Sequence, residues 1–244
     1  MNRETLPLYI QIADDIRESI NQGIYEKGEK LPSEAKFSAQ FAVNRHTIRQ
    51  AIGLLKLEGL LRVDRGRGMF VAEKTIRYPI GKRVRYNQAL KSQGRLGKYD
   101  FIRESEVPAD TSVAKNLEID QGEPVALIER LGFADSEPII VATSYFPLKL
   151  FPNFLSPENV ELLHELKSIS KFMHKLYDCD HIRRNTSVSA RLIQPHDARL
   201  LQVALNQAIL LVESINLNQA GKVIEYGVTR FRADKVVLDF ENPV

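Results

Sequence analysis

Residues 31–72 read LPSEAKFSAQFAVNRHTIRQAIGLLKLEGLLRVDRGRGMFVA, and this stretch decides the fold of the N-terminal part of the chain. Ser33 and Asn44 are residue types that favour a helix N-cap. Only a tight turn fits between the helix that ends near Phe41 and the helix that starts after Asn44. The pattern therefore predicts two helices joined by a short turn.

The second of these helices has an apolar face formed by Ile48, Ala51 and Leu55 at helical spacing. Its opposite face begins with basic and hydroxyl side chains. In helix-turn-helix proteins, the first residues of the second helix enter the major groove of DNA. Arginine can bond to guanine through two hydrogen bonds, and threonine can contact a base or a phosphate. We therefore place four side chains in the groove, with a solvated helix face as the alternative: Arg45, His46, Thr47 and Arg49.

A short hairpin follows, with strands expected over 60–63 and 69–72 and the sequence DRGRG between them. The glycines permit positive φ angles in the turn. Arg65 and Arg67 at its tip are suited to the minor groove or the DNA backbone. A nucleotide-binding phosphate loop is the rival interpretation. It fails because neither the Walker nor the dinucleotide spacing is present.

The whole run resembles the DNA-binding domain of the GntR family of bacterial regulators, over about the first seventy residues. One departure is that the family commonly has arginine where this chain has Ala35, so one expected DNA contact is missing. The resemblance implies DNA contacts at Ser33, Glu34, Arg45, Thr47, Arg49, Arg65, Gly66 and Arg67.

The bulk composition is that of a soluble globular protein of two domains, with 244 residues, 43% hydrophobic and 27% charged. Net charge is only +3, but the basic residues are concentrated in the first hundred positions. Cys179 is the single cysteine, so no internal disulfide forms. The chain has no long apolar run and begins without a secretory signal, so we expect a cytoplasmic protein with no membrane partner.

The rest of the chain mixes strand and helix patterns, which predicts an α+β fold with an antiparallel sheet in the second domain. The expected division is a winged helix-turn-helix domain over 1–74, a linker over 75–83 that contains Pro79 and Gly81, and a second domain over 84–244. Strands are expected over 125–133, 139–145, 188–193, 209–218 and 223–232, and helices over 158–166, 168–177 and from Pro195.

This second part resembles the UTRA effector domain of the HutC branch of the GntR family, whose fold is like that of chorismate lyase. The residues that carry the resemblance are Glu123-Pro124, the turn ADSEPI at 134–139 and EYGVTRFRAD at 225–234. The stretches VNRHTIR at 43–49 and RYPIGKRVRYNQALKSQG at 77–94 are most similar to phosphonate-utilisation regulators of this branch.

The resemblance also implies an effector pocket, lined by Arg85, Asn87, Arg130, Ser168 and Glu225. Arg85 and Asn87 stand where sugar-phosphate sensors of this branch carry small hydroxyl residues, which favours a strongly anionic effector. Guanidinium groups are well suited to phosphate and phosphonate. Alternatives remain open at this point: Ser168 can simply cap its helix, and Glu225 can be solvated or pair with Arg230. The face of the sheet on which Arg130 lies is also open.

We expect a homodimeric repressor, without cofactor or metal, that is released from operator DNA by a small anionic effector. His174, Cys179 and His181 are close in sequence, but their spacing matches no common zinc pattern. The rival functions are the same kind of regulator responding to a phosphorylated sugar or carboxylate, a chorismate-lyase-type enzyme fused to a DNA-binding head, and a DNA-binding protein that senses no ligand.

Overall fold

The computed structural model describes residues 6–64, 66–72, 75–81 and 86–240. The chain divides into two compact units, an N-terminal unit over 1–74 and a C-terminal unit over 75–244. Each has its own apolar core. Within the described residues, no helix is both long and apolar enough to cross a bilayer.

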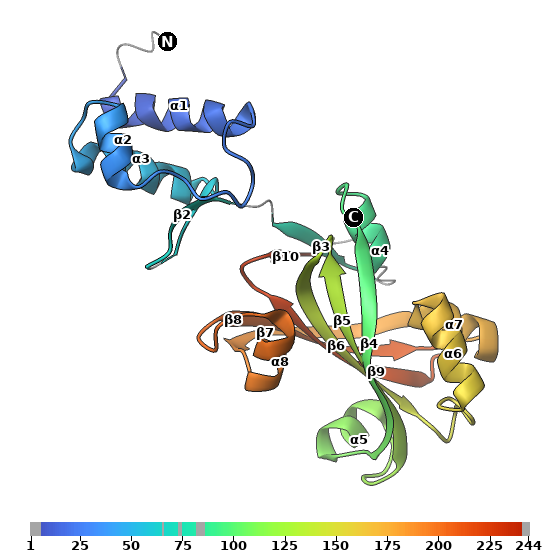
Figure 1. Cartoon of the computed structure of the whole chain (residues 1–244). Coiled ribbons are helices and arrows are strands. Elements are labelled where there is room, and N and C mark those ends of the chain that lie inside the picture. Colours follow the sequence, from blue (N-terminus) through green and yellow to red (C-terminus); the bar gives the residue numbers. More distant parts are fainter. Residues whose placement is uncertain (1–5, 65, 73–74, 82–85, 241–244) are drawn as a thin grey trace. The chain divides into compact units, whose positions relative to one another are not determined.

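The N-terminal unit contains three helices and a hairpin (Figure 1). Helix α1 buries Ile12 and Ile16 against α3, and Phe37 of α2 is fully buried beside them. The five elements are α1 (Leu8–Asn21), α2 (Glu34–Gln40), α3 (Arg45–Leu57), β1 (Leu61–Asp64) and β2 (Gly68–Val71).

Helices α2 and α3 begin with the N-caps that the sequence predicts. The Ser33 hydroxyl accepts a hydrogen bond from the Lys36 amide, and the Asn44 side chain accepts one from the Thr47 amide at 2.9 Å. Ala42 has a φ of 51°, which allows the chain to reverse within three residues. This turn fixes the start of α3, whose first residues carry the predicted DNA contacts.

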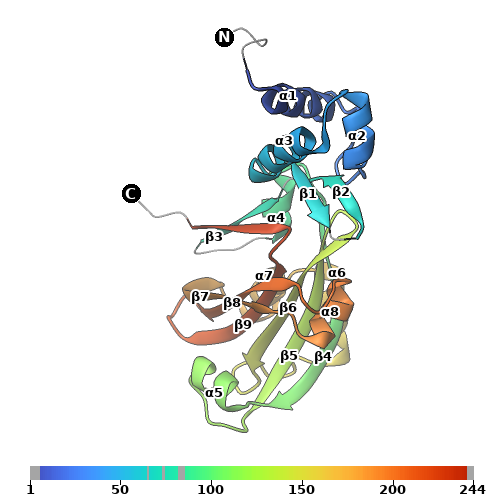
Figure 2. The ribbon, with the colours of Figure 1, turned by 90° about the vertical axis from the view of Figure 1, so that its left-hand side faces the viewer.

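The C-terminal unit is built on a six-stranded antiparallel sheet with the strand order β4-β5-β6-β9-β8-β7 (Figure 2). It brings the middle of the sequence next to its last hairpin, because β6 pairs with β9. The strands are β4 (Gly97–Pro108), β5 (Pro124–Ala134), β6 (Glu137–Pro147), β7 (Ile182–Leu192), β8 (Ala208–Leu217) and β9 (Val223–Arg232).

Helices cover both faces of this sheet. One face, which we call the first face, packs against α4 (Tyr86–Lys91) at one end and against α6 (Pro157–Leu166) and α7 (Ile169–Tyr177) at the other. The opposite face packs against α5 (Thr111–Leu117) and α8 (Pro195–Leu201). The first face therefore has two separate apolar clusters, and the strands between them carry polar side chains.

The predicted linker over 75–83 differs from the structure, because part of it is a strand. Strand β3 (Ile76–Ile80) pairs in parallel with β10 (Val236–Phe240) at the other end of the chain. Ile76, Tyr78 and Ile80 are buried and alternate with exposed residues, as expected for a strand with one face on the core. A parallel partner so distant in sequence leaves no local turn signal.

We expect Phe37→Ala to destabilise the N-terminal unit by about 3–5 kcal/mol, because it leaves a cavity where Phe37 packs against the rings of Tyr25 and Phe41. Urea denaturation of the full chain, followed by circular dichroism, measures the effect. Leu57→Ala is the matched control, since Leu57 is 88% exposed at the end of α3. A variant whose unfolding transition stays at the wild-type position would contradict the expected core.

Candidate functional site

A line of polar side chains crosses the first face of the sheet between the two apolar clusters. Arg130 on β5 donates a hydrogen bond to the Ser144 hydroxyl on β6 at 3.1 Å, and Ser144 in turn bonds to Glu225 on β9. The Asn216 amide on β8 donates to Glu225 at 2.6 Å, and Asn216 stands in register with Arg183 on β7. We call these five residues the polar line.

Glu225 is at the centre of the polar line and is only 6% exposed. His181 lies just before β7, with its Nε2 3.1 Å from a carboxylate oxygen of Glu225. The other ring nitrogen of His181 is 3.4 Å from the Ser170 hydroxyl in the first turn of α7. These contacts join the polar line to the N-terminal end of α7.

The electrostatics keep Glu225 charged. Burial alone would raise the pKa of this carboxyl, but the charges of His181 and Arg130 and the hydrogen bonds from Ser144 and Asn216 lower it below its usual value. Glu225 therefore supplies one negative charge in a site that also contains two arginines.

Several buried polar atoms here have no partner among the described residues. They include Nε of Arg130, Nε and Nη1 of Arg183, the Thr186 hydroxyl and Nε2 of His181, which is at ion-pair distance from Glu225 but outside hydrogen-bond geometry. A buried polar group left unsatisfied costs about 1–3 kcal/mol. Such a concentration of unmet hydrogen-bonding capacity is typical of a ligand site.

The structure brings together two of the predicted effector-binding residues, Arg130 and Glu225. Ser168 caps α7, accepting a hydrogen bond from the Lys171 amide at 3.4 Å. Asn87 is exposed on α4 and packs over Gly97, outside the polar line. Arg85 lies outside the described residues.

The suggested pairing of Glu225 with Arg230 is wrong, because these side chains lie on opposite faces of the sheet. Arg230 instead contacts Glu129 at 3.3 Å and Asp197 at 3.2 Å, and it donates to the Thr143 hydroxyl at 2.8 Å. Glu225 bonds to Asn216 on the first face.

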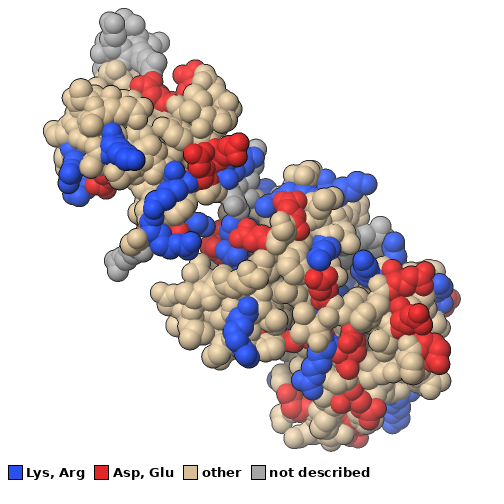
Figure 3. Space-filling model, viewed as in Figure 1, with Lys and Arg blue, Asp and Glu red and all other residues tan. Residues whose placement is uncertain are grey.

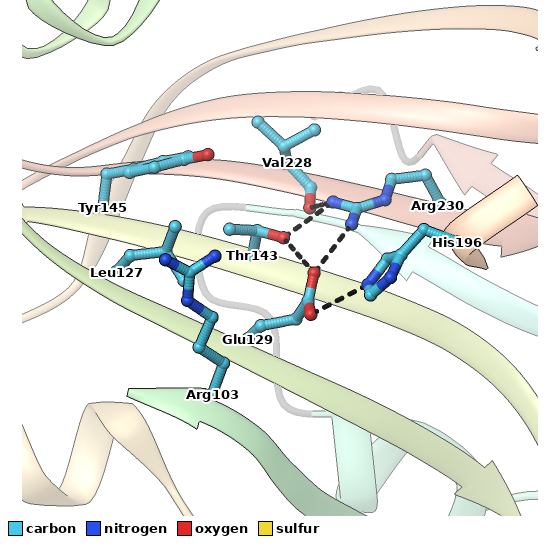
Figure 4. Close-up of a pocket in the computed structure, with 8 residues that line it drawn as sticks. All are labelled: Arg103, Leu127, Glu129, Thr143, Tyr145, His196, Val228 and Arg230. Carbon is cyan, nitrogen blue, oxygen red and sulfur yellow. Dashed lines mark hydrogen bonds and ion pairs between the residues drawn. The ribbon is translucent and has the colours of Figure 1, made fainter. Parts of the chain in front are cut away.

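A hollow of about 380 Å³ opens on that opposite face, as shown in Figure 4. Glu129 lies at its centre, bonded to Thr143 and Arg230 and 3.1 Å from His196 Nε2. Arg103 extends into the hollow from β4, and Arg230 comes from β9. The buried unpartnered atoms of the described residues are not among the side chains that line this hollow.

The N-terminal unit presents the predicted DNA contacts at the start of α3. Arg45 and His46 are exposed, and the Thr47 hydroxyl bonds to the Asn44 side chain at 3.0 Å. Arg49 is exposed and donates a hydrogen bond to the Glu34 carboxylate at 2.8 Å. This ion pair joins two of the predicted contact residues, one on α3 and one on α2.

The β1–β2 hairpin presents the remaining predicted contacts. Gly66 has a φ of 76°, which explains the need for glycine at the tip. Arg67 is exposed beside it, and Arg65 lies outside the described residues. Figure 3 shows Lys and Arg side chains along this hairpin.

Among the described residues, no group of three or more His, Cys, Asp or Glu side chains is arranged to hold a metal ion. Cys179 is buried, and burial raises the pKa of its thiol.

Comparison with known families gives two matches. Residues 8–71 match the bacterial regulatory proteins of the gntR family, and residues 92–237 match the UTRA domain. Together these segments contain the helices and hairpin of the N-terminal unit and the six-stranded sheet with all residues of the polar line.

Individual relatives extend over nearly the whole chain. An uncharacterized HTH-type transcriptional regulator of Rhizobium meliloti (strain 1021) is 33% identical, covering 96% of this chain and 94% of the relative. The mannosyl-D-glycerate transport/metabolism system repressor MngR of Escherichia coli (strain K12) is 28% identical, covering 93% and 92%. The crystal structure of PhnF from Mycobacterium smegmatis superposes with a TM-score of 0.67 at 23% identity, covering 96% and 99%, which shows a shared fold.

Because the folded-state pKa of Glu225 is lowered, its charge stabilises the fold above the ordinary pKa of 4.5, and this stabilisation is lost as pH falls below it. We expect the free energy of unfolding of Glu225→Gln to fall less than that of wild type as the pH is lowered from about 6 to about 3. Urea unfolding at a series of pH values measures this. Glu161→Gln, on the exposed side of α6, is the control and should follow wild type. Parallel stability profiles for Glu225→Gln and wild type would contradict the expectation.

Proposed function

This chain belongs to the GntR family of bacterial regulatory proteins and carries a UTRA domain, and from that premise we propose that it represses genes of phosphonate uptake and metabolism. As a member of this family it is a ligand-responsive transcriptional regulator and not an enzyme. The observation that carries the proposal about its effector is the group of buried, unpartnered cationic atoms around Glu225.

The start of α3 and the hairpin tip are the proposed DNA-reading groups. Arg45, His46 and Arg49 are exposed on one short stretch of helix, which suits base contacts in a major groove. Ser33 and Glu34 at the start of α2, together with Thr47, Gly66 and Arg67, are proposed to contact the backbone or to orient the reading side chains. An operator with two-fold symmetry would be bound by a homodimer.

The first face of the sheet is the proposed effector site. Arg130 and Glu225 come from the resemblance, and the unpartnered buried atoms around them support the proposal. Ser168, the third residue that the resemblance implies, caps α7. A phosphonate or phosphate ester offers three charged oxygens that arginines bind strongly. The sequence similarity to phosphonate-utilisation regulators favours phosphonate over other anions.

Repression is proposed on two grounds. A 28%-identical relative is named a repressor. The second ground is a proposed coupling, in which effector binding favours a dimer shape whose two DNA-reading heads no longer match the operator spacing. By linkage, operator DNA then weakens effector binding by the same factor.

A carboxylate or phosphorylated-sugar effector is the second candidate. It is favoured by the name of the same relative, which concerns mannosyl-D-glycerate, a carboxylate-bearing sugar derivative. The two candidates differ in the anion that meets Arg130, so a direct comparison of ligands separates them.

For the DNA-reading surface, we expect Arg49→Ala to weaken operator binding by roughly 1–3 kcal/mol if it reads a base, whereas Arg67→Ala should mainly reduce the salt dependence. Fluorescence anisotropy on a promoter fragment selected by the protein, at several salt concentrations, measures both. Lys115→Ala on α5 removes one exposed charge from the other unit and is the control. Unchanged binding in both arginine variants would refute the groove assignment.

For the effector, we expect one of a panel of phosphonates, phosphorylated sugars and carboxylates to raise the unfolding temperature of the full chain and to release it from that promoter fragment. Arg130→Gln should keep DNA binding and lose most of this response, because it removes a guanidinium whose Nε is buried at the site without a partner among the described residues. A phosphonate as the strongest ligand supports the main proposal, and a carboxylate or sugar phosphate supports the second. No response to any compound would leave the protein a DNA binder that senses none of these ligands and would contradict both.

A further inference from the structure

Arg183 lies at the end of the polar line, where the sequence predicted no strand. Strand β7 begins at Ile182, and Arg183 stands opposite Asn216, the residue that holds Glu225. The next residue, Arg184, is exposed and paired with Glu118 at 2.7 Å. The two consecutive arginines therefore have different surroundings, since Arg183 is half-buried and Arg184 is at the surface.

Arg183 lacks the contacts that normally accompany a buried cation. Its Nε and Nη1 atoms are buried and have no partner among the described residues. Burial lowers the pKa of this guanidinium, against the opposing influence of Tyr78 and Glu225. Buried charges are usually paired and fully hydrogen-bonded, since an unpaired one is costly.

Arg130 and Arg183 lie on the same face of the sheet, at the two ends of the polar line with Glu225 between them. Burial raises the pKa of the Tyr78 phenol, and the charges of Arg183 and Arg130 both oppose that rise. Both also act electrostatically on Glu225, and Arg130 Nε is likewise buried and unpartnered. The single carboxylate between them is already engaged by Asn216 and Ser144.

We propose that Arg183 and Arg130 together form a two-arginine clamp that binds a tetrahedral oxyanion, a phosphonate or phosphate monoester group, with Glu225 accepting a hydrogen bond from a donor elsewhere on the ligand. This inference rests on the proposed function only in taking the bound anion to be the effector. It assigns Arg183 as a binding residue and narrows the class of ligand.

The chemistry of the clamp favours three oxygens over two. A carboxylate presents two oxygens in one plane, which suit a single guanidinium in the bidentate geometry. A tetrahedral group presents three charged oxygens in different directions, so it has one acceptor for Arg130 Nε and one for each of the two unpartnered nitrogens of Arg183. The Thr186 hydroxyl, also buried and unpartnered, is a further donor on the same strand as Arg183.

The test is calorimetric titration of the full chain, without DNA, with methylphosphonate, inorganic phosphate and acetate as probes. We expect both tetrahedral anions to bind and acetate to bind much more weakly. Arg183→Gln should weaken the binding of methylphosphonate about tenfold to a hundredfold, the loss expected for charge-assisted hydrogen bonds. Arg184→Gln, one residue along the chain, should bind like wild type.

A second measurement separates binding from a structural role. Removing a half-buried guanidinium that has two buried nitrogens without partners should leave the unfolding temperature of ligand-free Arg183→Gln unchanged or higher, whereas a structural arginine would give a lower one. The clamp is refuted if Arg183→Gln and Arg184→Gln bind methylphosphonate equally, if acetate binds as well as the tetrahedral anions, or if wild type binds neither of them at millimolar concentration. None of these results bears on promoter binding, which is measured on the same preparations and tests the proposed function separately.

Discussion

Two arginines place half-buried guanidinium groups on one face of a β-sheet, and the described residues around them satisfy only part of their hydrogen-bonding capacity. Arg130 has one hydroxyl partner and stacks on the Tyr99 ring at 4.9 Å, and Arg183 is buried beside a carboxylate that other side chains already hold. Taking such charges out of water is unfavourable unless something compensates. The apolar clusters on either side of the polar line supply the folding energy that makes this arrangement tolerable.

The opposite face of the same sheet shows what a complete network looks like. Arg230 donates hydrogen bonds to the Thr143 hydroxyl, the Val228 carbonyl and the carboxylates of Glu129 and Asp197. Its guanidinium donors therefore have acceptors within the protein. The residue types resemble those of the first face, namely arginine, glutamate, histidine and a hydroxyl. The difference is in completeness, because one network closes on itself and the other needs acceptors from outside. A closed network serves stability, and an open one is suited to binding.

The extent to which the sequence predicted this arrangement differs between the two units. In the N-terminal unit, helical periodicity and the N-caps Ser33 and Asn44 are local signals, and the helices lie where those signals put them. In the C-terminal unit, resemblance supplied Arg130 and Glu225, but Ser144, Asn216 and Arg183 join them only through strand register, which no local pattern encodes. One error was avoidable, since Glu225 and Arg230 are five residues apart on one strand and must therefore point to opposite faces.

Strand β3 lies in the segment that the sequence predicted to be a linker. It connects the site to the N-terminal unit along the chain. Tyr78 lies on β3, two residues after the strand begins at Ile76 and only a few residues after the N-terminal unit ends at Lys74. Its phenol is buried, and the charges of Arg183 and Arg130 both act on it. A ligand bound at the proposed two-arginine clamp would change the electrostatic surroundings of Tyr78, which lies on the strand that follows the N-terminal unit in sequence. Within the described residues β3 pairs with a single strand, β10, whereas the central strands of the six-stranded sheet have a partner on each side. Fewer backbone hydrogen bonds hold β3, which favours it over the central strands as the element that responds to the ligand.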